Sequence, residues 1–120
     1  MYNIIKIGET EVPMLALACV DLCYERIFHA DPIKIQAAKD YGPAEGIELF
    51  QKMGFVMAEY AQRKSIKAMA ELTEDDYAEW LCQFDRGAYM TAIADVRATY
   101  EGQKVTYADP KPEADLQNAN

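Results

Sequence analysis

The pattern of apolar and polar positions first predicts a pair of short strands. Residues 2–7 are rich in isoleucine and tyrosine, residues 8–10 are typical of a turn, and residues 11–13 can return as a second strand. Pro13 restricts that second strand to the edge of a sheet. Because an isolated two-stranded hairpin is marginally stable in water, we expect it to pack on helices or to pair with another chain.

Residues 14–29 predict the first helix, whose apolar side chains nearly surround the helix axis. Such a helix must be covered on two sides, so we expect the other elements to pack around it. Asp31 can then act as the N-cap of a short second helix, with Pro32 at its first position. We expect this second helix to end near Lys39.

The longest predicted helix extends from about Pro43 to Ala70. Its apolar arc includes Ile47, Phe50, Met53 and Met57, whereas Phe55 falls within its polar arc. Either a neighbouring loop covers Phe55, or this side chain is an exposed contact for another chain.

Two further helices are predicted in the last third of the chain. Thr73 is a suitable N-cap, acidic residues fill the first turn after it, and a narrow apolar stripe follows. The last helix carries the most regular stripe, formed by Tyr89, Ile93, Val96 and Tyr100, and Gly102 is well placed to end it.

These elements predict a mainly α fold, in which a small N-terminal β-hairpin is followed by a compact bundle of four to five helices. Residues 1–102 form the single helical domain with its hairpin. Residues 103–120 are polar and contain two prolines, so we expect an extended or disordered tail.

Composition narrows the classes of partner. The chain has 20 acidic and 12 basic side chains and a formal net charge of −8 at pH 7, which argues against binding to nucleic acid. No apolar run approaches the roughly 20 residues of a membrane span, and the N-terminus does not resemble a signal peptide. We therefore expect a cytoplasmic protein that binds neither nucleic acid nor membrane.

The sequence contains little catalytic machinery. It lacks glycine-rich phosphate loops, the common hydrolase and protease motifs, and calcium-loop patterns. Cys19, Cys23 and Cys82 have no zinc-like spacing and favour buried reduced thiols, and Asp21 and Glu25 favour a solvated helix edge. We expect no enzymatic activity, no cofactor and no metal.

Residues suited to adaptable contacts are plentiful, with six methionines and eight tyrosines in the chain. They fit a small core and a protein-binding surface equally well.

The order of several segments resembles the tail assembly chaperones of long-tailed bacteriophages and prophages. Tyr24, Arg26, Phe28 and Asp31 correspond to that family's Y-R-x-x-F-G-x-D type segment, with Arg26 one place later and His29 where glycine is common. The resemblance spans about residues 2 to 112 and is carried by the segments IKIGETEVPM, YERIFHADP, LFQKMGFVMAEYA, ELTEDDYAEWL and YADPKPEA.

The resemblance implies a non-enzymatic role in the cytoplasm of the host bacterium. Such chaperones bind the tape-measure protein, keep it soluble and help to recruit tail-tube subunits, and self-association is expected. As a hypothesis, Phe50, Met53, Phe55 and Met57 form part of the surface that binds the partner or a second copy. The family-like segment from Tyr24 to Asp31 is expected to position the binding helices without touching the partner.

A different class of protein also fits the composition. A small acidic regulator, of the antitoxin or anti-repressor type, would cover a basic surface with the acidic stretch at residues 71–85. Its binding would weaken steeply with salt, whereas a chaperone that grips apolar stripes would be much less sensitive.

Overall fold

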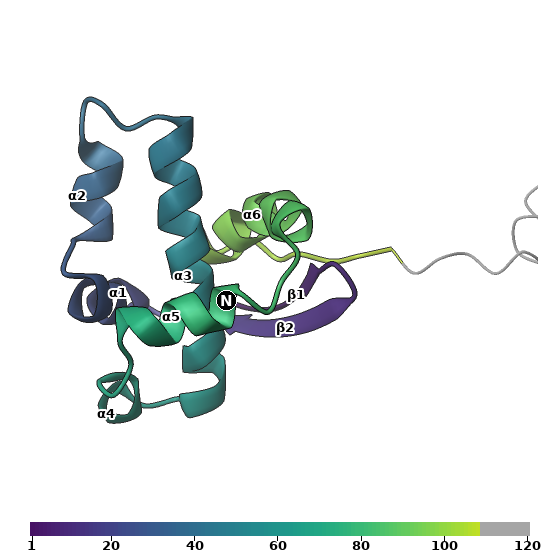
Figure 1. Ribbon diagram of the computed structural model, residues 1–120, viewed down its shortest axis with the longest axis horizontal. Coiled ribbons are helices and arrows are strands. Elements are labelled where there is room, and N and C mark those ends of the chain that lie inside the picture. Colours follow the sequence, from purple (N-terminus) through teal and green to yellow (C-terminus); the bar gives the residue numbers. More distant parts are fainter. Residues whose placement is uncertain (109–120) are drawn as a thin grey trace, which may run out of the picture.

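The computed structural model describes residues 1–108 and has an antiparallel hairpin followed, over these residues, by six helices (Figure 1). The strands are β1 (Tyr2–Ile7) and β2 (Thr10–Leu15), and the helices are α1 (Val20–Phe28), α2 (Pro32–Ala37), α3 (Pro43–Arg63), α4 (Ile66–Met69), α5 (Glu74–Leu81) and α6 (Arg86–Tyr100). The mainly helical architecture with an N-terminal hairpin agrees with the prediction, whereas the described part has one helix more than the predicted four to five. The extra helix arises because Lys64 has a φ of 54°, which ends α3, and α4 then begins after Ser65.

The second strand is longer than predicted and includes residues assigned to the first helix. Gly8 has a φ of 63°, which suits the first position of a two-residue hairpin turn, and β2 continues through Pro13 to Leu15. Met14 faces inward and is fully buried. The predicted start of the first helix at Met14 is therefore wrong, and α1 begins at Val20.

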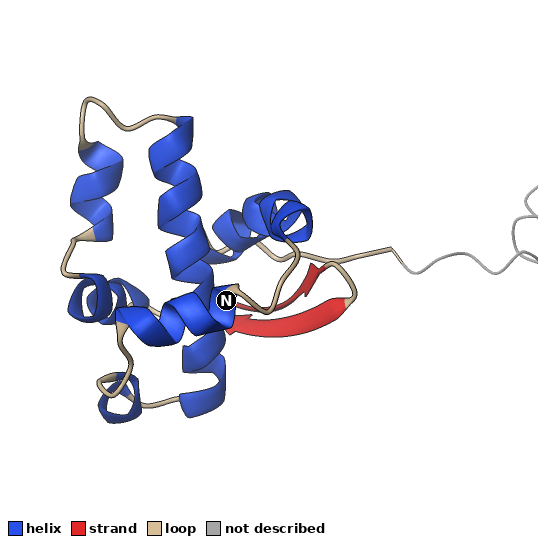
Figure 2. Ribbon diagram, in the orientation of Figure 1, coloured by secondary structure: helices blue, strands red, loops and turns tan. Residues whose placement is uncertain are grey.

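The centre of the molecule is α3, and not the first helix as the sequence suggested. Six consecutive residues, from Met53 to Ala58, are buried because β2, α6, α1 and α5 pack around α3 (Figure 2). Gly54 allows α6 to come close, since a Cβ at this position would overlap the hydroxyl of Tyr89. The helix axis that the other elements surround is thus that of α3.

Local signals at the other helix ends agree with their predicted roles. The Asp31 side chain accepts a hydrogen bond from the backbone N of Ile33 at 2.9 Å, and Pro32 opens α2. Thr73 and Asp76 form a reciprocal capping box at the start of α5. Gly102, with a φ of 84°, follows the end of α6.

The segment after α6 is extended and is fastened to the hairpin. We call residues 103–107 the strap. The fully buried Asn3 donates from Nδ2 to Thr99 Oγ1 and to the carbonyl of Gln103, both at 2.9 Å, and its Oδ1 accepts from the backbone N of Val105 at 3.1 Å. At the end of the strap, the hydroxyl of Tyr107 donates to Asp95 Oδ2 at 2.7 Å. The remaining part of the predicted tail, residues 109–120, lies outside the described residues.

Candidate functional site

The four residues proposed as a contact surface lie in the core. Phe50 is 2% exposed, and Met53, Phe55 and Met57 are fully buried. They cannot form an exposed surface on this folded chain, so that hypothesis needs correction. Of these four side chains, Phe50 borders a hollow between α3 and α6.

Phe55 is covered by a neighbouring element, as in the first of the two predicted alternatives. That element is a helix, however, and not a loop. Its ring centroid lies 5.7 Å from that of Tyr77 and 5.6 Å from that of Trp80, both on α5. The charged residues of the arc around Phe55 pair with each other along α3, as in the 2.9 Å contact between Lys52 and Glu48. The methionines of α3 pack inside in the same way, so they do not line an exposed groove.

The family-like segment links α1 to the helices around it. The ring centroid of Phe28 lies 4.9 Å from that of Tyr24 and 5.2 Å from that of Tyr77, the latter nearly edge-on. Asp31 caps α2, whereas Arg26 lies on the exposed side of α1. Tyr24, Phe28 and Asp31 therefore act together to fix the positions of α1 and α2, and Arg26 does not join them.

The most suitable place for a partner is an apolar groove between the first half of α3 and α6, which we call the α3–α6 groove. It has a volume of about 360 Å³, compared with about 260 and 280 Å³ for two neighbouring hollows. This volume lies near the lower end of the range for ligand pockets, roughly 300–1,000 Å³. The groove is lined by Tyr41, Gly42, Pro43, Gly46, Ile47, Phe50, Ile93 and Arg97.

Local structure keeps this groove in shape. Pro43 opens α3, and the Glu45 carboxylate accepts a hydrogen bond from the backbone N of Gly42 at 2.9 Å, which fixes the rim. Phe50 is held edge-on by Tyr100, with ring centroids 5.6 Å apart, and Arg97 lies 5.9 Å from the Phe50 centroid. The groove thus has a rigid aromatic base and a cation at its edge.

Sequence reasoning missed the groove although it named Ile47, Phe50 and Ile93 among the apolar positions. Ile47 and Ile93 were each assigned to an apolar stripe, and both are in fact half-buried. The stripes showed that these side chains face the inside of the fold. They could not show that a hollow remains between α3 and α6 and leaves both side chains partly accessible.

Burial shifts the pKa values of several tyrosines and of one cysteine in the described part of the chain. Every resolved pKa shift is upward: burial raises the pKa of Cys23 to about 11 and that of Tyr77 to about 12, the latter with a further contribution from Glu48. Burial and a hydrogen bond to Asp21 likewise raise the pKa of Tyr100 to about 12. These hydroxyls and this thiol stay protonated at neutral pH, so they are structural groups here and not activated nucleophiles.

Two further features concern metals and membranes. Within residues 1–108, no three His, Cys, Asp or Glu side chains are placed to hold a metal ion. In the same part of the chain, no helix combines the length and the apolar character needed to cross a membrane.

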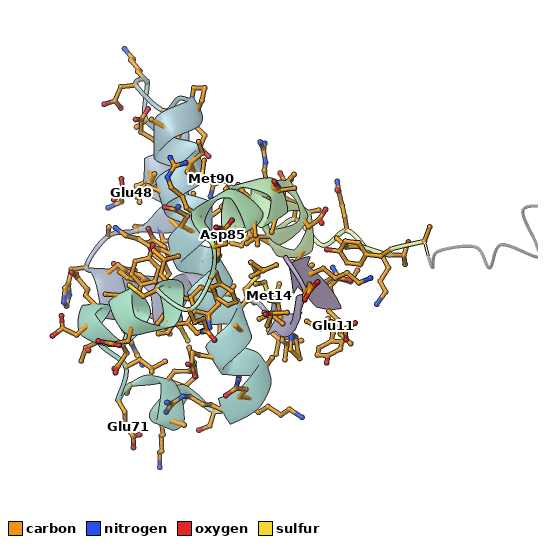
Figure 3. All side chains as sticks on the ribbon, turned by 45° about the vertical axis from the view of Figure 1, so that its right-hand side comes forward. Glu11, Met14, Glu48, Glu71, Asp85 and Met90 are labelled. Atoms are coloured by element: carbon orange, nitrogen blue, oxygen red, sulfur yellow. The ribbon has the colours of Figure 1, made fainter. Side chains whose placement is uncertain are left out.

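The acidic stretch forms a separate exposed surface on and around α5. Figure 3 shows Glu71 near one end of it and Asp85 near the other. All six of its acidic side chains are exposed: Glu71, Glu74, Asp75, Asp76, Glu79 and Asp85. Three of these acids stand in the first turn of α5, where the positive end of the helix dipole stabilises them.

Comparisons of the chain with protein-family models, with curated proteins and with solved structures find no match.

Proposed function

We propose that this protein is a tail assembly chaperone of a long-tailed bacteriophage or prophage. In this role it binds the helical tape-measure protein in the host cytoplasm, keeps it soluble and helps to recruit tail-tube subunits, without enzymatic activity or a cofactor. The order of the segments along the chain supports the family. The single structural observation that carries a binding role is the open apolar α3–α6 groove.

The groove suits one side of an amphipathic helix. Ile47 and Ile93 offer partly exposed aliphatic surface on opposite walls, and Phe50 gives a flat base between them. Each apolar side chain that a partner helix buries there contributes about 1.5–3 kcal/mol before the cost of association. A tape-measure protein carries many apolar stripes along its helices. Many copies of the chaperone can therefore cover the whole tape-measure protein, even if each binds with modest affinity.

Ile93→Lys tests this proposal. A charged side chain in the groove wall should weaken binding to a soluble tape-measure segment at least about tenfold, because the groove cannot pair the charge with a partner of opposite sign. The segment should also become insoluble on co-expression with this variant. Binding is measured by isothermal titration calorimetry, and thermal melting verifies that the variant is folded.

Ile33→Lys is the matched control, since Ile33 is 55% exposed on α2 and does not line the groove. This control should bind as the unmodified protein does. Equal binding by both variants and the unmodified protein would show that the groove does not hold the partner.

The same titration distinguishes the chaperone from the acidic regulator, the alternative function that the exposed acidic side chains around α5 favour. Affinity that falls steeply between low and physiological salt, together with loss of binding when Glu74, Asp75 and Asp76 are replaced by their amides, would support a basic partner. Nearly salt-independent binding supports the chaperone.

A further inference from the structure

The outward face of the hairpin carries apolar side chains that the described elements leave partly exposed. Tyr2 is 47% exposed and Ile4 is 43% exposed, and their cross-strand partners Leu15 and Pro13 are half-buried. The opposite face packs on α3 and α6. Figure 3 shows this contrast for β2, where Met14 points toward the helices and Glu11 lies on the outer side.

Both edges of the hairpin are closed to a further strand, although its face is open. Met1 and Ala16 exchange two backbone hydrogen bonds of 2.8 Å. In an antiparallel ladder, hydrogen-bonded pairs alternate with non-bonded pairs. The backbone N–H and C=O groups of Tyr2, Ile4 and Lys6 therefore point away from β2. The strap occupies that edge, where the Lys6 N donates to the Tyr107 hydroxyl at 3.1 Å and Lys104 Nζ donates to the Tyr2 carbonyl at 3.1 Å.

The other edge is protected by its sequence. Pro13 is paired with Ile4 at a position where its nitrogen faces away from β1, and proline has no N–H to offer to a new strand. Addition of a strand at either edge is therefore disfavoured, and the open face is the part of the hairpin that remains available.

We propose that this face binds a second copy of the same chain, with a two-fold axis that runs along the midline of the hairpin. Such an axis places each residue of one strand opposite its cross-strand partner in the second copy. The register of the two strands then sets Tyr2 against Leu15, Ile4 against Pro13 and Lys6 against Glu11, each contact occurring twice.

The face is self-complementary under this symmetry, which is why a second copy is the occupant. Apolar side chains meet apolar side chains, and the one basic residue of each copy meets the one acidic residue of the other, both contacts lying at the turn end of the hairpin. A partner whose contacting surface carries charges of one sign would leave either Lys6 or Glu11 opposed by a like charge. Since only three residues per strand take part, the contact is smaller than a typical stable interface, and we expect a weak dimer that depends on concentration.

Opposite charge reversals test the arrangement. Lys6→Glu makes the face wholly acidic and Glu11→Lys makes it wholly basic, so each variant alone replaces two attractions across the axis with two repulsions. We expect the dissociation constant of each homodimer to rise about tenfold or more, as measured by sedimentation equilibrium. An equimolar mixture of the two variants should form a heterodimer at least as well as the unmodified protein forms its homodimer.

Glu9→Lys is the matched control for Glu11→Lys, because it makes the same change in net charge at the hairpin turn, outside the paired face. It should dimerise like the unmodified protein, and thermal melting should show that all variants are folded. The proposal is overturned if the unmodified protein stays monomeric up to millimolar concentration, if the single variants dimerise normally, or if their mixture does not associate. Because these residues lie outside the α3–α6 groove, failure here leaves the tape-measure proposal intact.

Discussion

Replacing Phe55 with glutamate is expected to leave the chain unfolded. This side chain is fully buried between α3 and α5, in contact with the rings of Tyr77 and Trp80. Loss of a buried phenylalanine costs about 3–5 kcal/mol, and an unpaired buried carboxylate adds several more. The sum approaches or exceeds the whole stability of an ordinary domain, roughly 5–15 kcal/mol.

Circular dichroism with thermal and urea denaturation measures this effect. Phe55→Leu is the matched control, because it keeps an apolar side chain and should unfold cooperatively from a native state. A folded Phe55→Glu variant with an unchanged melting temperature would place Phe55 on the surface and restore it as a contact residue.

The second large effect is expected at Phe28. Its ring packs against Tyr24 and Tyr77, and Lys52 Nζ lies 5.2 Å from its centroid. Phe28→Ala should lower the free energy of unfolding by about 3–5 kcal/mol, because the cavity lies where α1, α3 and α5 meet.

Urea denaturation gives this value directly. Arg26→Ala is the control from the same family-like segment, and its exposed side chain predicts a change within about 0.5 kcal/mol. Similar losses for both variants would mean that Arg26 also has a structural role.

Features specified by neighbouring residues were predictable from the sequence. The hairpin turn follows from Gly8 and the hydrophobic strand before it, and the starts of α2 and α5 follow from Asp31 and Thr73. In each case a side chain or backbone torsion acts within a few residues, so the signal is complete in a short window of sequence.

Features that depend on distant segments were not predictable. Met14 fits both the apolar pattern of a helix and the alternating pattern of a strand. It belongs to β2 because its side chain is buried against the helices. The sequence left open whether Phe55 is covered or exposed, because α5, which covers it, lies about 20 residues later. Asn3 is joined to Thr99 across a sequence separation of 96 residues, so its role as the anchor of the strap has no local signature.

The isoleucine methyl groups provide the most direct test of the proposed binding mode. Ile47 and Ile93 lie in the α3–α6 groove, Ile33 is exposed on α2, and Ile5 is fully buried beneath the hairpin. In a methyl NMR titration of the folded protein with a soluble tape-measure segment, we expect the signals of Ile47 and Ile93 to shift while those of Ile33 and Ile5 stay in place. A saturating titration that leaves Ile47 and Ile93 unchanged would contradict binding in the groove.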